Sequence, residues 1–427
     1  MQKIADIRLQ DSPLKDRVGL LIIYYYFPPR GGVAVQRVVK LCKYLPQFGI
    51  DVTVLTSGAR YASFVDETLM QEIPSGVRVI KTGEETAKEG QFGRKNILID
   101  SFISWVPRAT RAAQEIIMQG GVNAIMLTSP PHSQQLIGLL LKRRLGIPWI
   151  ADFRDPWTSD LRFMQRKGLF NRWIEKWVEK RVLKRADCVI ATCEAAVESF
   201  RRKAGRNQGA RRGLLDKFVC ITNGYDPDDY DYAIRPPDDV LIFSYVGSTG
   251  QYISDPSLFL RALRMALDQE PALARKIRLN FIGSVENRIK RQVEKLGLLP
   301  VVHFFGNVPH REAVRMMCES HVLLLFELPV QDGRPTLVLP SKVFEYIGAR
   351  RPIMAMVTNG DSRRMVSDYD GGIVVDPHDI DTMAKQVKRY FELFSKGQLQ
   401  PLPTPPLELS REYLAKKFAD ITRKISA

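Results

Sequence analysis

Cysteine and histidine are scarce in this sequence, with five of each among 427 residues. The cysteines lie singly along the chain, with no Cys-x-x-Cys pair and no histidine at the spacing of metal ligands. A disulfide framework needs paired cysteines, and a zinc site needs clustered ligands. The scarcity therefore excludes both, and predicts buried thiols at Cys42, Cys188, Cys193, Cys220 and Cys318.

Long apolar runs are also missing. The longest, Val18 to Phe27, has about half of the ~20 residues that a helix needs to cross a bilayer. The first 17 residues carry charges throughout and contain no apolar core, so we expect no secretory signal. The sequence predicts a cytoplasmic protein, at most peripheral on the inner face of the membrane.

Positive charge is abundant: 63 Lys and Arg against 47 Asp and Glu give a net charge of +16. Such an excess favours an anionic partner: nucleic acid, a phosphorylated substrate or an acidic membrane surface. The basic residues are not interleaved with a stacking platform of aromatic side chains, and no nucleic-acid-binding motif occurs. We therefore expect no nucleic acid partner.

Apolar, β-rich runs alternate with helical periodicity along almost the whole chain. Because these runs are apolar throughout and separated by helices, they predict parallel sheets of the doubly wound type. A Pro- and Asp-rich stretch at 226–240 is typical of a linker, after which the pattern starts again. The sequence thus predicts an α/β protein with an N-terminal Rossmann-like domain over 17–236, a C-terminal one over 237–400, and a ligand cleft between them.

The stretch IIYYYFPPRGG, residues 22–32, runs a buried strand directly into two prolines and a glycine pair. Proline cannot donate to a sheet, and glycine lets backbone approach a ligand closely. From these residues alone, an ordinary strand-to-helix turn and a ligand-binding loop are both open. Four later stretches add to the pattern: ADFRDPW, CITNGYD, FFGNVPHREAVRMMCESHVLLL and LPSKVFEYIGARRPIMAM.

In this order the five stretches resemble the retaining nucleotide-sugar glycosyltransferases of GT-B fold, of the family 4-like, group 1 class. The resemblance covers nearly the whole chain from about Arg17. It implies two Rossmann-like domains facing a cleft, with the C-terminal helix 410–427 crossing back to the N-terminal domain. It also implies that a sugar moves from a nucleoside diphosphate to a glycan or lipid-linked acceptor, with retention, in bacterial surface polysaccharide assembly.

The resemblance divides the donor site between the C-terminal domain and the glycine loop. Glu345 would accept hydrogen bonds from the ribose hydroxyls, since a carboxylate offers two acceptor oxygens. Lys342, one helical turn earlier, would neutralise diphosphate. Backbone amides at Gly31 and Gly32 would hold phosphate oxygens at the start of a helix.

The sequence departs from the family pattern on the donor side. Leu337 stands where many relatives have a second glutamate, and Ser248 and Thr249 stand where the family has basic residues. Other donors must then meet the diphosphate charge, and Arg30 from the opposite domain is one candidate. The remaining donor-binding candidates are Gly247, Ser248, Thr249, Gly306, Val308, Arg334, Thr336, Leu337 and Val338, those around Gly306 facing the base.

The acceptor side offers Asp152, Arg154, Asp155 and His132 as candidate catalytic residues. Arg154 occupies the place of a histidine that relatives often carry, and Asp155 matches the aspartate after it. Asp152 and Asp155 are the carboxylates best placed to contact sugar or acceptor, and either would equally cap a helix or pair with Arg154. His132 follows a proline pair and would reach the site or be a loop histidine without a role.

The sequence contains two copies of a short motif that binds metal in other proteins. Asp-Tyr-Asp occurs at 229–231 and 368–370, and D-x-D is the metal motif of a different glycosyltransferase fold. Neither copy follows an apolar strand, so we expect chance occurrence, no metal ion and no cofactor. Fixed positive groups and N–H donors would then stabilise the departing diphosphate.

Residues 161–185, LRFMQRKGLFNRWIEKWVEKRVLKR, carry Trp173 and Trp177 at helical spacing among many basic residues. A basic helix with tryptophan on its apolar face can lie on an anionic bilayer, and the basic segment 201–213 would add to such a surface. The alternative is that the tryptophans face the domain core.

Two other functions stay open at this point. A nucleotide-sugar 2-epimerase shares the fold, but it needs acid and base groups near the sugar. A catalytically silent subunit that binds nucleotide or a partner glycosyltransferase is the other, and the departures at Arg154, Leu337 and Ser248 keep it open.

Overall fold

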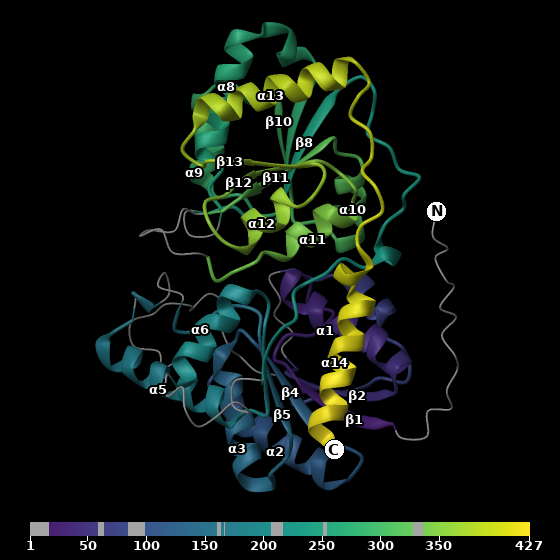
Figure 1. Ribbon diagram of the computed structural model, residues 1–427, viewed down its shortest axis with the longest axis vertical. Coiled ribbons are helices and arrows are strands. Elements are labelled where there is room, and N and C mark those ends of the chain that lie inside the picture. Colours follow the sequence, from purple (N-terminus) through teal and green to yellow (C-terminus); the bar gives the residue numbers. More distant parts are fainter. Residues whose placement is uncertain are drawn as a thin grey trace.

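The computed structural model describes residues 17–58, 64–83, 99–159, 164–165, 167–205, 217–250, 254–327 and 336–427. These residues form two α/β domains that lie one above the other along the long axis, with the N-terminal domain at the bottom in Figure 1. Both sheets are entirely parallel and doubly wound, which confirms the predicted fold class.

The N-terminal domain is built on a sheet whose described strands follow the order β3-β2-β1-β4-β5-β6-β7. Its interior strand β1 buries Leu20 to Ile23 almost completely, because helices cover both faces of the sheet. Each such aliphatic side chain stabilises the fold by about 1.5–3 kcal/mol. The strands are β1 (Val18–Ile23), β2 (Ile50–Thr56), β3 (Arg78–Lys81), β4 (Ala124–Ser129), β5 (Trp149–Phe153), β6 (Cys188–Ala191) and β7 (Phe218–Cys220).

The helices of this domain run between the strands and supply the return connections. They are α1 (Val33–Tyr44), α2 (Trp105–Met118), α3 (Gln135–Leu145), α5 (Leu169–Arg185) and α6 (Glu194–Ala204). Short 3-10 segments complete the connections: η1 (Leu45–Phe48), η2 (Glu67–Glu72), η3 (His132–Gln134) and η4 (Pro227–Asp229).

The C-terminal domain repeats the design, with the strand order β10-β9-β8-β11-β12-β13. Its strands are β8 (Leu241–Val246), β9 (Ile277–Ile282), β10 (Val302–Gly306), β11 (Val322–Phe326), β12 (Ile353–Met356) and β13 (Gly372–Val375). Its helices are α8 (Ser257–Gln269), η5 (Pro271–Arg275), α9 (Asn287–Lys295), α10 (His310–Cys318), α11 (Ser341–Gly348), α12 (Asp361–Ser367) and α13 (Ile380–Ser395).

The chain crosses between the domains twice, first at the linker after β7 and again after α13. The second crossing ends in η7 (Leu407–Leu409) and the final helix α14 (Arg411–Ser426), which lies along α1 of the N-terminal domain in Figure 1. Ser410 caps α14 by accepting a hydrogen bond from the Tyr413 N–H at 3.2 Å. Leu414 and Phe418 are buried against the N-terminal domain, so α14 belongs to that domain's core.

Helix α5 lies at the outer edge of the N-terminal domain beside α6 (Figure 1), and it does not bury its tryptophans. The side chains of Trp173 and Trp177 are 64% and 46% exposed, and Leu169 and Phe170 are more exposed still. The interpretation in which the tryptophans face the core is therefore wrong. None of the described helices is long and apolar enough to cross a membrane.

Candidate functional site

The glycine loop begins where β1 ends, and its two glycines have different roles. Gly31 is buried, and a Cβ there would lie 2.5 Å from the Phe64 ring, so close packing requires this glycine. Gly32 is exposed with φ +95°, and a Cβ there would meet no other atom within 4 Å. Gly32 directly precedes α1, whose N-terminus has no side-chain cap. Its backbone is therefore open to an anion, as the helix dipole favours.

In the C-terminal domain, Lys342 and the loop after β8 come together. The Lys342 ammonium donates to the Tyr245 hydroxyl at 2.6 Å and lies 4.1 Å from the centre of that ring. A Cβ on Gly247, which has φ +127°, would be only 2.7 Å from the Lys342 Nζ atom. The Tyr245 hydroxyl in turn donates to the Ser248 carbonyl oxygen. The helix thus supplies a cation next to a loop whose own sequence has none.

Thr249 does not join this group of exposed atoms. It is buried, its N–H donates to the Ser284 carbonyl at 2.9 Å, and its hydroxyl accepts from the Glu286 N–H at 3.4 Å. Its contacts shape the loop after β8, so the structure gives it a positioning role and not a donor contact.

Glu345 lies on α11 one turn after Lys342, at the junction of the domains. Its carbonyl oxygen accepts a hydrogen bond from the Tyr230 hydroxyl of the linker at 3.0 Å. The carboxylate accepts no hydrogen bond from the described residues, and its Oε1 atom lies 4.0 Å from the Nε2 atom of His310. Although only 9% of the residue is exposed, both acceptor oxygens are unused. This is the arrangement expected of a group that awaits a hydroxyl donor.

His310 and Asp66 connect the two halves of the site, and neither was a candidate from the sequence. The backbone N–H of His310 donates to the Asp66 carboxylate across the junction at 2.8 Å. Asp66 packs beside Gly31, and its own N–H donates to the Pro29 carbonyl. The signal available in the sequence was the position of His310 directly after the stretch proposed to face the base. A continuous set of contacts therefore runs from the glycine loop to Glu345.

A buried charge cluster lies behind this junction, centred on Lys40. Its ammonium lies 2.6 Å from a Glu72 oxygen, 2.7 Å from Asp226 and 2.6 Å from Asp229. Burial opposes the charge, but the three carboxylates outweigh it and raise the pKa of Lys40 to about 12.

Asp229 of this cluster belongs to the first of the two Asp-Tyr-Asp copies, at 229–231. Atoms of Glu72, Asp229 and His310 lie within 4.8 Å of one another, a spacing that a metal ion could use. The Lys40 ammonium already contacts two of the three and supplies the positive charge there. Asp231 accepts a hydrogen bond from the Ala233 N–H and stabilises the turn of the linker.

The structure corrects the interpretation of Asp152. This residue is fully buried, and its two oxygens accept hydrogen bonds from Arg37 at 2.9 and 3.1 Å and from the Thr128 hydroxyl at 2.6 Å. Its partner is therefore Arg37 on α1 and not Arg154, and complete burial keeps the carboxylate out of reach of an acceptor. Asp152 is a structural residue that ties β5 to α1.

The other acceptor-side candidates lie near the ends of β1, β4 and β5. Arg154 donates to the Ala34 and Pro130 carbonyls and to the Tyr24 hydroxyl, so its guanidinium clamps three segments. Asp155 is partly exposed two residues beyond β5. The structure gives Arg154 a positioning role and leaves Asp155 as a partly exposed carboxylate near the end of β5.

His132 stacks on the Trp157 ring, with centroids 5.1 Å apart and planes 5° from parallel. Burial, together with the charges of Lys167 and Arg154, lowers the pKa of His132 to about 3. The imidazole is therefore neutral at neutral pH, and its Nδ1 atom has no partner among the described residues. It can exchange a hydrogen bond with a ligand but cannot supply a proton as an imidazolium acid.

The remaining donor-side candidates surround the junction. Gly306 is exposed with φ +69°, and Val308 is partly exposed two residues before α10 begins at His310. Thr336 forms a bridge to Gly360, and the Leu337 carbonyl accepts from the Cys193 thiol of the N-terminal domain at 3.3 Å. The segment 336–338 thus reaches across to the other domain. Arg334 lies outside the described residues.

Two family profiles match the chain, one over each domain. Residues 31–211 match the family described as Glycosyl transferase 4-like domain, and residues 229–396 match Glycosyl transferases group 1. No curated protein matches the chain significantly.

Solved structures match over nearly the whole length. Sucrose-phosphate synthase from Thermosynechococcus elongatus has a TM-score of 0.66 at 17% identity, over 96% of this chain and 99% of that one. Anabaena HepE in complex with UDP and glucose has a TM-score of 0.60 at 14% identity, over 96% and 97%. WaaG, a glycosyltransferase involved in lipopolysaccharide biosynthesis, has a TM-score of 0.55 at 15% identity, over 96% and 98%. At such identities the likeness establishes the fold.

Two Rossmann-like domains that meet at a junction, matched over nearly the whole chain by structures of this class, define the GT-B fold. Since profiles of this class match both domains, the chain belongs to the group 1 glycosyltransferases.

Proposed function

We propose that this glycosyltransferase moves a sugar from a nucleoside diphosphate to a glycan or lipid-linked acceptor, with retention, in bacterial surface polysaccharide assembly. The observation that carries the donor assignment is the Glu345 carboxylate, which is buried at the domain junction with both oxygens unused. Lys342 lies one turn away on the same helix. A carboxylate and a cation at this spacing suit the vicinal hydroxyls and the diphosphate of one nucleotide.

The charge of the departing diphosphate is met from both domains in this proposal. Lys342 contributes a full positive charge beside Gly247, and the N-terminus of α1 after Gly32 contributes amide donors and the helix dipole. These groups are fixed by the fold before the donor arrives, so little reorganisation accompanies bond cleavage. No metal ion is required for this charge balance.

The acceptor enters from the N-terminal domain side. Asp155 is the accessible carboxylate there, and His132 is a neutral hydrogen-bonding group near the ends of the strands. We propose these two residues as contacts to the acceptor or the transferred sugar. WaaG is involved in lipopolysaccharide biosynthesis. The similarity to WaaG supports an acceptor of the glycan or lipid-linked class for this chain.

The 2-epimerase alternative needs a proton acid and a base beside the sugar. Asp152 is saturated by Arg37 and Thr128, and the pKa of His132 is lowered to about 3, so neither suits that chemistry. This favours transfer over epimerisation.

The first test is a calorimetric survey of UDP, GDP, ADP and TDP sugars with the full chain, with and without a chelator. We expect one nucleotide series to bind and the affinity to be unchanged by the chelator. Binding of none of them would favour the silent-subunit alternative, and loss of binding on chelation would contradict metal independence.

We also propose that α5 holds the protein at an anionic membrane surface, where a lipid-linked acceptor would lie. Its exposed apolar residues Leu169, Phe170, Trp173 and Trp177 occupy one face, and the rings of Phe170 and Trp173 stack 6.4 Å apart. Exposed basic residues flank this face: Lys176, Lys180, Arg181, Lys184 and Arg185. Apolar anchoring combined with basic charge is the pattern of an interfacial helix.

This surface is tested by sedimentation with vesicles of phosphatidylglycerol and of phosphatidylcholine. The full chain is expected to sediment with the anionic vesicles only, and Trp173→Ser to lose most of that binding. Leu145→Ser, which removes an exposed apolar residue elsewhere on the same domain, is the matched control. Equal recovery with both vesicle types, or no effect of Trp173→Ser, would remove the membrane proposal.

A further inference from the structure

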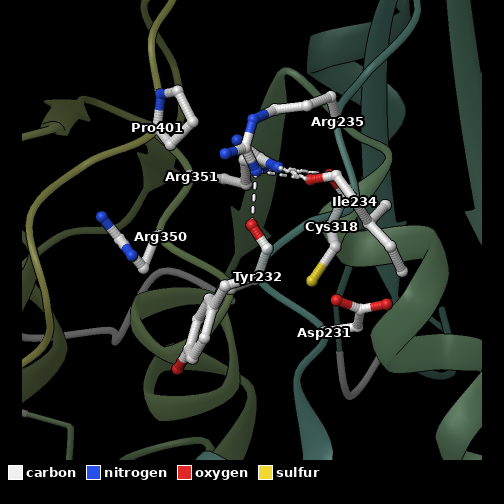
Figure 2. A pocket seen from close by; sticks show the side chains of 9 residues that line it. Asp231, Tyr232, Ile234, Arg235, Cys318, Arg350, Arg351 and Pro401 are labelled. Carbon is white, nitrogen blue, oxygen red and sulfur yellow. Dashed lines mark hydrogen bonds between the residues drawn. The ribbon is translucent and has the colours of Figure 1, made fainter.

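A small pocket lies where the two chain crossings pass between the domains, away from the donor-side residues. Figure 2 shows it from close by: Tyr232 and Arg235 of the linker, Pro401 of the returning segment, and Arg350 and Arg351 after α11. The donor-side residue Lys342 lies near the beginning of α11, whereas Arg350 and Arg351 follow its end. The pocket is therefore separate from the donor site, although one helix links them.

Two guanidinium groups converge in this pocket. Nη1 of Arg235 and Nη2 of Arg351 donate to the same oxygen, the Ile234 carbonyl, at 3.1 and 3.2 Å. Arg351 also donates from Nε and Nη2 to the Cys318 carbonyl at 3.1 and 2.6 Å. Arg351 is only 4% exposed, so its orientation is fixed by the fold.

Arg350 adds a third charge from the other side of the pocket (Figure 2). Its Nε atom donates to the Leu402 carbonyl at 2.6 Å, and its guanidinium carbon lies 5.3 Å from the centre of the Tyr232 ring. Nη1 and Nη2 of Arg350 and Nη1 of Arg351 donate to none of the described residues. Charged donors thus remain for a further partner.

The three arginine charges form no direct ion pair. Within the described parts of the chain, none of the three arginines lies within 4.0 Å of a carboxylate, in contrast to the buried Arg37 and Lys40. Asp231 also lines the pocket and contributes one negative charge, which leaves the three arginine charges in excess. Burial lowers the pKa of Arg351, and the charges of its two arginine neighbours act in the same direction. Three clustered cations that contact only carbonyl oxygens favour an added anion.

We propose that this pocket binds a phosphate group, either inorganic phosphate or the terminal group of a phosphomonoester. Planar guanidinium groups suit the geometry of phosphate oxygens. The space is small, about 30 Å³, and open to solvent on one side, so it suits one compact anionic group. The bound anion would join the linker, through Arg235, to the segment that follows α11, and so stiffen the connection between the domains.

The test is a calorimetric titration of the full chain with inorganic phosphate and with glycerol 3-phosphate at constant ionic strength. The variants are Arg235→Gln and the double change Arg235→Gln with Arg350→Gln, and Arg351 stays intact because it is buried. Arg291→Gln, an exposed arginine on α9, is the charge-matched control. Since phosphate can also occupy a diphosphate site, Lys342→Ala is titrated in parallel.

We expect the double variant to weaken phosphate binding at least about tenfold, the scale of lost charged hydrogen bonds, with a smaller loss for Arg235→Gln. Arg291→Gln is expected to bind as the unmodified chain does, and Lys342→Ala to retain the phosphate binding that the double variant loses. Tighter binding of the ester than of inorganic phosphate would identify a phosphomonoester as the ligand, and the reverse would identify free phosphate. Absence of binding by both probes, or equal binding by the double variant whose circular dichroism is native, would overturn the proposal.

Discussion

The carboxylates of Asp152 and Glu345 are both buried, but their surroundings give them opposite roles. Three donor atoms from Arg37 and Thr128 saturate Asp152. Glu345 has a histidine at 4.0 Å and no hydrogen bond to its carboxylate from the described residues. A carboxylate whose oxygens accept hydrogen bonds within the protein stabilises the fold. A carboxylate at a domain junction that accepts none is available to a ligand.

Asp152→Ala is predicted to cost about 3–5 kcal/mol of unfolding free energy, because it leaves the buried Arg37 charge without its partner. Urea unfolding followed by circular dichroism measures this loss. Asp420→Ala, which breaks an exposed ion pair on α14, is the control and is expected to change stability by about 1 kcal/mol or less. An Asp152→Ala protein of normal stability that no longer transfers sugar would instead make this residue a catalytic contact.

At the scale of elements, the last helix of the chain, α14, packs on the N-terminal domain, although the whole C-terminal domain lies between them in the sequence. Its buried face packs on α1, and the Arg37 guanidinium lies 5.1 Å from the centre of the Phe418 ring. The backbone of Arg411 donates to the Tyr225 carbonyl at 2.7 Å, which fixes the entry into the helix. The N-terminal sheet therefore depends on the last residues of the chain for part of its cover.

Phe418→Ala is expected to lower the unfolding free energy by about 3–5 kcal/mol, since it removes a buried ring and leaves a cavity between α14 and α1. Tyr413→Ala on the same helix serves as the comparison, because that side chain is 39% exposed. The comparison variant should lose about 1 kcal/mol or less. Similar losses for the two changes, measured by thermal and urea unfolding, would show that α14 does not contribute to the core.

The long buried strands could be predicted from the sequence, and the short edge strands β3 and β13 could not. Strands such as β1 and β11 are apolar throughout because both faces are covered. The edge strands β3 and β13 have four residues each and are only partly buried, and the apolar runs that mark them are only two and three residues long. A short segment at a sheet edge becomes a strand because it pairs with a neighbouring strand, and its own composition does not reveal this.

Helix α5 shows why the apolar face of a helix is hard to place from the sequence. Its buried side includes Glu175 and Glu179, which accept hydrogen bonds from the Trp157 indole and from Thr158. These carboxylates are satisfied by partners far along the chain, which leaves Trp173 and Trp177 on the exposed side. The donor residues on α11 were predictable from a motif, whereas the pairing of Asp152 with Arg37 depends on how α1 packs on β5.

At the scale of the whole molecule, buried charges tie the linker to the N-terminal domain. Asp226 is fully buried in its side chain and contacts both Lys40 and Lys43. Burial alone would raise the pKa of Asp226, but the lysine charges and hydrogen bonds outweigh it and lower the pKa to about 2. The linker is therefore anchored by ion pairs where it leaves the first domain.

This anchoring predicts a pH dependence of stability. The pKa of Asp226 is lower in the folded chain, so its contribution is present above about pH 4 and is lost as the pH falls towards 2. The loss amounts to about 2 kcal/mol for a shift of this size. Unfolding midpoints in urea at pH 5 and pH 3 are expected to differ less for Asp226→Asn than for the unmodified chain. Asp239→Asn, at an exposed linker position, should retain the full difference.

The central claim is that Glu345 binds the ribose of a nucleoside diphosphate sugar. Calorimetric titration of the nucleotide that binds the unmodified chain, repeated with Glu345→Ala and with Glu294→Ala, tests it most directly. We predict that Glu345→Ala weakens binding by about 1–3 kcal/mol, the scale of a lost charged hydrogen bond, while Glu294→Ala, an exposed glutamate on α9, leaves the affinity unchanged. Equal affinity of a folded Glu345→Ala protein and the unmodified chain would contradict the claim.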